Sequence, residues 1–155
     1  MENNPSNAVD PLGLSDCINL FPTKDPIYTN TQTTPLPPGS LVVAGHGNSI
    51  GMIRQNGIGY YTSKEMTQYI TNRPSYNTNM PVYFLSCNLG VGCSNSPAAY
   101  YVRSLPNPTY AGTNFVWVGS NINYFADGTN MNKPVGFGPT NCHPVGPHTP
   151  WVLVH

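Results

Sequence analysis

Three short runs of apolar residues stand out against an otherwise polar chain. They are LVVA at 41–44, PVYFLSC at 81–87 and FVWV at 115–118. None of the three alternates apolar with polar residues, so each is typical of a strand that is buried on both faces. Such strands occur in parallel sheets covered on both sides, and we expect all three runs to share one sheet.

A helix is predicted between the first two strands. Thr62 and Glu65 form the sequence pattern of a capping box. Three apolar residues spaced for one helical face follow it, namely Met66, Tyr69 and Ile70. The helix should cover about residues 63–72, because Pro74 disfavours its continuation. This strand–helix–strand order places the two flanking strands parallel in one sheet.

Two more elements are expected further along the chain. A helix should begin near Pro97 and reach about Leu105, after a turn that follows residue 87. WVLV at 151–154 should form an edge strand, with the prolines before it stiffening the segment. Together these elements predict a small α/β domain with a mainly parallel sheet and an edge strand from the C-terminal tail.

Composition limits the size and the partners of this domain. With 155 residues, of which 39% are hydrophobic, the chain fits one compact domain. Only 8% of residues are charged, six basic and six acidic, so we expect neither a nucleic acid nor a membrane surface as partner. The 15 glycines and 17 prolines predict many loops. No apolar stretch is long enough to span a bilayer, and no signal peptide pattern is expected at the N-terminus.

The ends of the first two strands carry chemistry. His46 follows the run at 41–44, and Cys87 closes the run at 81–87. Because parallel strands end at the same edge of a sheet, where open α/β folds bind ligands, we expect these two residues to be neighbours. A thiol beside an imidazole provides a nucleophile and its general base, and the imidazole can lower the pKa of the thiol.

Gly47 fits the same interpretation. Without a side chain, its backbone can approach a substrate closely, and its amide and that of Cys87 are candidate donors to an oxyanion. Cys93 is a competing thiol, but no strand precedes it. Three residues are candidates for orienting His46, and the sequence does not choose between them: Asn88, Asn114 and Asp127.

The remaining cysteines and histidines give weaker signals. One disulfide, from Cys17 or Cys93 to Cys142, is an alternative to four free thiols. The C-terminal tail gathers Cys142, His143, His148 and His155. Their spacing matches no standard zinc site, so we expect no metal and no other cofactor.

The two strand ends also resemble a known family. An apolar block ending in HG, here VVAGHG, and a second ending in SC, here VYFLSC, resemble the caspase-like (clan CD) cysteine peptidases. GYYTSKEMTQYI and SCNLG resemble in particular the self-processing cysteine protease domains of bacterial toxins. Over roughly residues 40–120, the resemblance implies a three-layer caspase-like core with His46 as general base, Cys87 as nucleophile and Gly47 as oxyanion donor. Those proteases are activated by inositol hexakisphosphate, which we do not expect here because the six basic residues are scattered along the chain.

The N-terminal segment resembles a second motif. NNPSNAVDPLGL, residues 3–14, is similar to the motif that closes the core of RHS/YD-repeat proteins, the shells of Rhs and Tc toxins. The resemblance implies that residues 1–14 are a remnant of the shell and that residues 15–155 are a toxin. Such a toxin is secreted or translocated into a target cell, where it would cleave a protein. Its expected partners are the protein substrate, the RHS shell and a cognate immunity protein.

Three alternatives to a peptidase follow from the same residues. A cysteine-dependent deamidase or transglutaminase would use the same two side chains, although such enzymes usually present cysteine before histidine. An ADP-ribosyltransferase would need a catalytic glutamate, and Glu65 is the only one beyond the N-terminal segment. A binding module without catalysis would leave His46 and Cys87 far apart.

Overall fold

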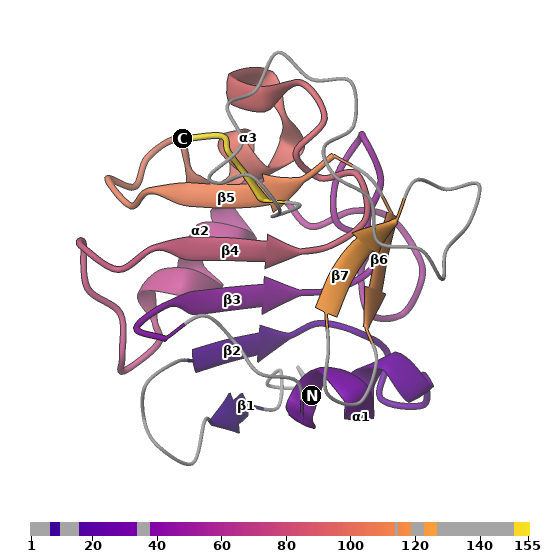
Figure 1. Cartoon of the computed structure of the whole chain (residues 1–155). Coiled ribbons are helices and arrows are strands. Elements are labelled where there is room, and N and C mark those ends of the chain that lie inside the picture. Colours follow the sequence, from indigo (N-terminus) through magenta and orange to yellow (C-terminus); the bar gives the residue numbers. More distant parts are fainter. Residues whose placement is uncertain (1–6, 10–15, 34–37, 114, 119–122, 127–150) are drawn as a thin grey trace.

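A six-stranded sheet forms the centre of the molecule (Figure 1). The computed structural model describes residues 7–9, 16–33, 38–113, 115–118, 123–126 and 151–155. In spatial order the strands are β1 (Asn7–Val9), β2 (Asp16–Asn19), β3 (Leu41–Ala44), β4 (Val82–Leu85), β5 (Thr109–Gly112) and β8 (Trp151–Leu153).

The four inner strands of the sheet are parallel. β2 pairs with β3, β3 with β4 and β4 with β5 in parallel, whereas β1 and β8 add antiparallel strands at the two edges. All four residues of β2 and of β3 are buried, which accounts for the continuous apolar sequence of β3, whereas β2 buries the polar Asp16 and Asn19 at its ends. The predicted α/β class, the parallel pairing of β3 with β4 and the C-terminal edge strand are therefore confirmed.

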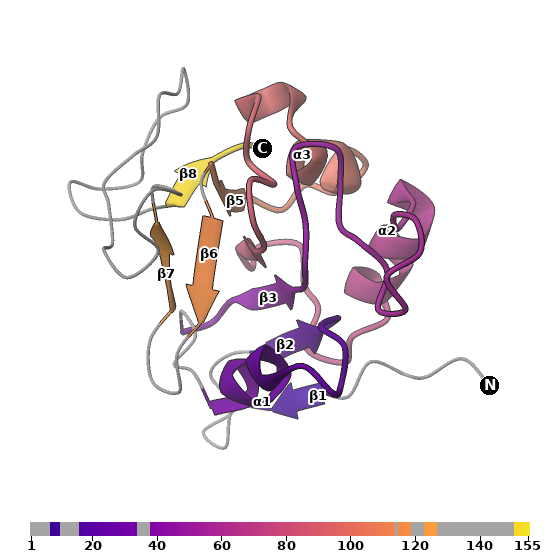
Figure 2. The same ribbon diagram turned by 90° about the vertical axis from the view of Figure 1, so that its right-hand side faces the viewer.

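Helices cover one face of the sheet and contribute to the cover of the other. α2 (Ser63–Thr71) and α3 (Pro97–Val102) pack against each other on one face, and a short 3-10 helix, η1 (Cys93–Asn95), precedes α3. α1 (Pro26–Thr33) packs on the other face together with the hairpin formed by β6 (Phe115–Val118) and β7 (Asn123–Ala126) (Figure 2). The molecule therefore has three layers.

The capping box predicted for α2 is present. The Thr62 hydroxyl accepts a hydrogen bond from the Glu65 N–H, and the Glu65 carboxylate accepts one from the Thr62 N–H. α3 begins in a similar way, because the Ser96 hydroxyl accepts from the Ala99 N–H and Pro97 occupies the first helical position. Both helices thus begin where the sequence predicted them.

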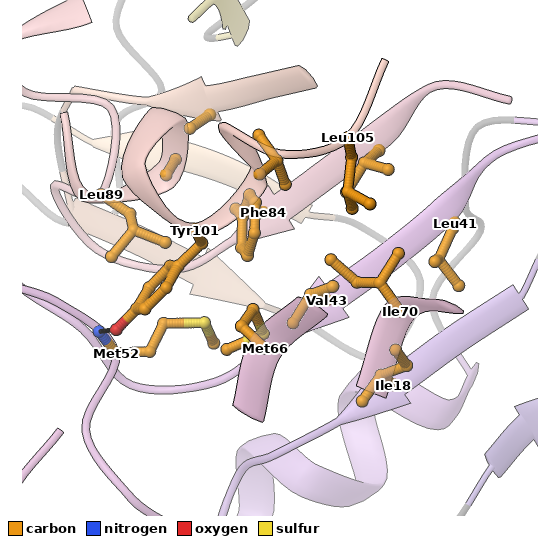
Figure 3. Packing of buried hydrophobic residues seen from close by; sticks show 14 of the residues in the cluster. Ile18, Leu41, Val43, Met52, Met66, Ile70, Phe84, Leu89, Tyr101 and Leu105 are labelled. Carbon is orange, nitrogen blue, oxygen red and sulfur yellow. Dashed lines mark hydrogen bonds between the residues drawn. The ribbon is translucent and has the colours of Figure 1, made fainter. Parts of the chain in front are cut away.

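The larger hydrophobic cluster lies between the sheet and the pair α2–α3 (Figure 3). Met66 and Ile70 of α2 are fully buried against Val43 and Phe84 of the sheet. The Tyr101 hydroxyl accepts a hydrogen bond from the Met52 N–H at 2.9 Å and donates one to the Tyr61 carbonyl at 3.0 Å. This buried hydroxyl fixes the base of the long loop that connects β3 to α2.

The strand predicted at 115–118 forms, but in a different sheet from the one expected. β6 pairs only with β7 among the described strands, in a separate two-stranded sheet. The position beside β5 is taken by β8, so β6 does not pair with β5. Val116 and Val118 instead pack on the face of the sheet, with Val42 and Leu85 in the second hydrophobic cluster.

Part of the N-terminal segment also belongs to the sheet. We expected residues 1–14 to lie outside the domain, yet Asn7–Val9 form β1 and pair with Asp16–Ile18 of β2. The rest of the segment lies outside the described residues. Part of the N-terminal segment therefore belongs to the same sheet as the rest of the domain.

Candidate active site

His46 and Cys87 lie at the same edge and on the same face of the sheet. Ala44 of β3 is opposite Leu85 of β4, and each candidate residue lies two positions beyond its strand. The His46 ring contacts Phe21, which belongs to the second hydrophobic cluster, and Cys87 packs against the same cluster. Ala44, Leu85 and Cys87 all belong to the second hydrophobic cluster. His46 and Cys87 therefore follow adjacent parallel strands at the same edge of the sheet, and such strands lie about 4.8 Å apart.

A third side chain, from the loop after β2, holds the imidazole. Asp25 Oδ2 lies 2.8 Å from His46 Nε2. Asp25 Oδ1 accepts a hydrogen bond from the Ile27 N–H, which makes Asp25 the N-cap of α1, with Pro26 as the first helical residue. The two oxygens of one carboxylate thus anchor it to the helix and orient the histidine.

The charge of Asp25 is stabilised by these bonds. Burial alone would raise its pKa, but the hydrogen bonds from His46 and from the Ile27 N–H lower the pKa below the ordinary aspartate value. An ionised carboxylate only accepts hydrogen bonds, so Nε2 of His46 carries the proton of this pair. In the neutral imidazole the other ring nitrogen, Nδ1, then has a free lone pair and can act as a base.

The imidazole is positioned from a second side as well. The Phe21 ring meets the His46 ring edge to face, with centroids 4.9 Å apart. The side chains of His46 and Asp25 remain 43% and 32% exposed, so a substrate can reach the pair from solvent.

Cys87 is half-buried, and its sulfur contacts the backbone of β6. Sγ accepts a hydrogen bond from the Val116 N–H at 3.2 Å and lies 3.9 Å from the Val116 carbonyl oxygen. Among the described residues, no hydrogen bond joins Sγ to His46. Burial raises the pKa of the thiol, although the Val116 N–H opposes this effect. The expected lowering of the pKa is therefore not seen, because burial raises the pKa and the imidazole forms no hydrogen bond with the sulfur.

Gly47 lies where only a glycine fits. A Cβ at this position would be 2.2 Å from Ser86 Oγ and 3.4 Å from the Cys87 carbonyl oxygen. Gly47 and Met52 form an isolated antiparallel β-bridge. The hydrogen bonds of this bridge are made by the residues next to Gly47 and Met52, so the Gly47 N–H takes no part in them. Within the described part of the chain, neither this N–H nor that of Cys87 donates to a backbone carbonyl. Both amides therefore remain candidates for binding an oxyanion.

The other cysteines are less suited to react. Burial raises the pKa of Cys17 to about 12, and its thiol is free. Cys93 is disulfide-bonded, so it is not a competing nucleophile. The alternative that placed Cys17 in the disulfide is wrong, and Cys142 lies outside the described residues.

Sequence analysis missed the residue that orients His46. Asn114 and Asp127, two of the three candidates, lie outside the described residues. The third, Asn88, adopts a left-handed turn after Cys87 and forms no hydrogen bond with His46, whose Nε2 is held by Asp25. Two signals could have identified Asp25: the mostly apolar run CINLF at 17–21, which covers most of β2 and the two residues after it, and the aspartate–proline pair that begins a helix.

Residues 17–132 match a family described as a domain of unknown function, DUF8616. The chain belongs to this family. The matched segment includes Asp25, His46 and Cys87, so the whole candidate site lies inside the DUF8616 domain. Neither the curated proteins nor the solved structures include a significant match to the chain.

Glu65 of the DUF8616 domain already has partners. Its carboxylate forms two hydrogen bonds with the Arg54 guanidinium, at 2.7 and 2.9 Å, in addition to capping α2. The hydrogen bonds with Arg54 lower the pKa of Glu65 below its ordinary value. A glutamate held in this way has a structural role at the start of α2, as the capping pattern predicted.

The described part of the DUF8616 domain contains no group of three metal-ligating side chains. Of the C-terminal cluster, His155 is described and its Nε2 lies 2.7 Å from the Leu105 carbonyl oxygen, whereas Cys142, His143 and His148 lie outside the described residues. None of the described helices is long and apolar enough to cross a membrane.

Proposed function

We propose that this chain is a caspase-like cysteine peptidase in which Cys87 is the nucleophile, His46 the general base and Asp25 the residue that orients the base. The observation that carries the proposal is the 2.8 Å hydrogen bond between His46 and Asp25, at the sheet edge where a free cysteine, Cys87, follows the adjacent strand β4. A nucleophile, a base and a group that fixes the base are the parts that thiol catalysis requires.

The proposed reaction begins with a change of partner for Cys87. Rotation of its side chain moves Sγ from the Val116 backbone to Nδ1 of His46, which takes the thiol proton. The sulfur then attacks a peptide carbonyl carbon, and the N–H groups of Gly47 and Cys87 bind the oxyanion. The imidazolium gives its proton to the leaving amine as the C–N bond breaks, and water hydrolyses the resulting thioester.

Asp25 supports this sequence without exchanging a proton. It holds the imidazole in the tautomer whose Nδ1 accepts the proton, and its negative charge stabilises the imidazolium that forms. The thiol has a raised pKa in the present arrangement, so proton removal by His46 would be coupled to attack.

The biological setting is proposed from the resemblance of residues 3–14 to the closing motif of RHS cores. In this setting the chain is a toxin that is secreted with an RHS shell and translocated into a target cell. It cleaves a protein there, and a cognate immunity protein protects the producing cell.

Expression of variants in bacterial and eukaryotic cells tests the proposal. We expect wild type to arrest growth and to generate new protein N-termini, and we expect Cys87→Ala, His46→Ala and Asp25→Asn to do neither. Cys17→Ala is the matched control, because it removes another free thiol that lies outside the site. If Cys87→Ala is as toxic as wild type, the thiol mechanism is wrong.

The same experiment separates peptidase from other acyl transfer. A deamidase or transglutaminase with the same residues would modify glutamine side chains and would leave protein chains intact. Mass spectrometry of proteins from intoxicated cells distinguishes cleaved backbones from modified glutamines, and we expect cleaved backbones.

A further inference from the structure

The loop between β2 and α1 delivers two side chains to His46. Asp25 Oδ2 lies 2.8 Å from His46 Nε2, and the Phe21 ring meets the imidazole edge to face. Both residues belong to the segment 20–25, which joins β2 to α1. A loop loses much conformational entropy when it is held in one shape, so other groups must fix it. The orientation of the imidazole therefore depends on what fixes this segment.

Asn19, the last residue of β2, binds the chain on both sides of the turn at 22–25. Its Oδ1 accepts a hydrogen bond from the Phe21 N–H at 3.3 Å, and its Nδ2 donates one to the Tyr28 carbonyl at 3.0 Å. Asn19 is fully buried, so its two hydrogen bonds are shielded from water. Tyr28 lies in the first turn of α1, the helix that Asp25 caps. One buried amide thus fixes both the start of the loop and the helix that follows it.

A second amide holds Phe21 from the other side. The Gln55 side chain, from the loop between β3 and α2, donates a hydrogen bond to the Phe21 carbonyl at 2.9 Å. The Phe21 backbone is therefore held at its N–H by Asn19 and at its carbonyl by Gln55. An amide provides both a donor and acceptors, so the buried Asn19 can bind an N–H and a carbonyl at once.

Asn107 provides a comparison within the same molecule. It is also fully buried, and its amide donates hydrogen bonds to the Asn77 and Met80 carbonyls, each at 2.9 Å. Asn107 precedes β5, at the edge where the parallel strands begin, whereas His46 follows β3 at the edge where they end. The segment that Asn107 holds, residues 77–80, contains no residue of the candidate site.

We propose that Asn19 is a positioning residue that acts through Asp25. By fixing the loop and α1, it keeps the Asp25 carboxylate where it holds His46 as the base for Cys87. The inference rests on the proposed peptidase function and adds a residue to it. Loss of Asn19 should therefore slow the reaction of the thiol without changing how well the site binds a ligand.

Inactivation of Cys87 by a peptidyl acyloxymethyl ketone at pH 7 tests this inference. The dependence of the rate on inhibitor concentration separates the binding constant, KI, from the maximal rate constant, kinact. We expect Asn19→Ala to lower kinact at least about tenfold, because a small displacement of a catalytic group slows a reaction strongly, and to leave KI unchanged. Asp25→Ala already lacks the link to His46, so adding Asn19→Ala to it should change kinact less than about twofold.

Asn107→Ala is the matched control, because it removes a buried amide of the same kind at the opposite edge of the sheet. Like Asn19→Ala, it should lower the midpoint of thermal denaturation, but it should change kinact less than about twofold. If Asn19→Ala does not fold, Asn19→Thr replaces it. Its hydroxyl can still accept from the Phe21 N–H but is too short to reach the Tyr28 carbonyl, so kinact should fall about fivefold.

Three results would overturn this inference while the peptidase function stands. They are an unchanged kinact in the folded Asn19 variant, an equal loss of kinact in Asn107→Ala, and an effect of Asn19→Ala that is as large without Asp25 as with it. If Cys87 of wild type reacts no faster than Cys87 of His46→Ala, the proposed function itself fails, and this inference fails with it.

Discussion

Asp25 uses its two carboxylate oxygens for different partners, the first turn of α1 and the imidazole of His46. Its folded-state pKa is lowered by these hydrogen bonds, despite the opposing effect of burial. A group whose pKa is lower in the folded than in the unfolded state stabilises the fold at pH values above its unfolded pKa, about 3.9. This contribution is lost as the pH falls through the folded-state pKa.

Asp25→Asn should therefore make the free energy of unfolding less dependent on pH in the acid range. We expect the free energy of unfolding of wild type to fall more steeply below about pH 4 than that of the variant. Urea denaturation at a series of pH values measures the difference. Asp16 and Glu65 also have lowered pKa values and contribute equally to both proteins, so equal slopes would show that Asp25 is not held as described.

Gly47 and Ser86 make a pair that can be tested by substitution. Gly47→Ala would place a Cβ 2.2 Å from Ser86 Oγ, and such overpacking costs about 1–3 kcal/mol. Ser86 Oγ is itself buried without a hydrogen-bond partner among the described residues, so Ser86→Ala should be neutral or stabilising. The double variant should recover most of the lost stability in thermal denaturation. A double variant no more stable than Gly47→Ala would place the clash elsewhere.

At the scale of elements, the β6–β7 hairpin controls access to the thiol. Val116 contacts the sulfur, and the Asn30 side chain of α1 donates a hydrogen bond to the Val118 carbonyl at 3.1 Å. Loss of one such bond costs about 1 kcal/mol, which increases the population of an open hairpin about fivefold.

Asn30→Ala should accordingly speed the reaction of Cys87 with iodoacetamide several-fold at constant pH. Asn56→Ala is the control, because Asn56 lies in the loop between β3 and α2 and its side chain accepts a local hydrogen bond, from the Ile58 N–H. An unchanged rate in Asn30→Ala would show that β6 does not limit access to the sulfur.

Elements with strong local signals were predicted well. β3 and β4 have continuous apolar sequences, and α2 has its own capping box, so nothing distant is needed to specify them. α1 was missed because its sequence, PIYTNTQT, is mostly polar and shows little helical periodicity. Asp25 was missed with it. Whether β6 can pair with β5 depends on where β8 lies. The pairing of β5 with β8 joins distant parts of the chain and cannot be predicted from the local sequence of β6.

At the scale of the whole molecule, the structure leaves one accessible free thiol among the described residues. Cys17 is buried with a pKa of about 12, Cys93 is disulfide-bonded, and Cys87 is half-buried. In the native protein, iodoacetamide at pH 8 should modify Cys87 at least about tenfold faster than Cys17, because thiolate fraction and exposure both favour it. Peptide mapping after timed alkylation measures the two rates, and comparable rates would show that the core around Cys17 is open. Alkylation of the denatured, unreduced protein is the control that exposes both thiols.

The central claim is that His46, held by Asp25, acts as the base for Cys87. Its most direct test is the rate at which Cys87 reacts with a peptidyl acyloxymethyl ketone in a Cys17→Ala background, with and without His46→Ala. At pH 7 we expect His46→Ala to react more slowly than the protein with His46, by on the order of 100-fold. The difference should shrink as the pH rises towards about 10, because a growing fraction of the thiol then ionises without a base. Equal rates at pH 7 would contradict the account.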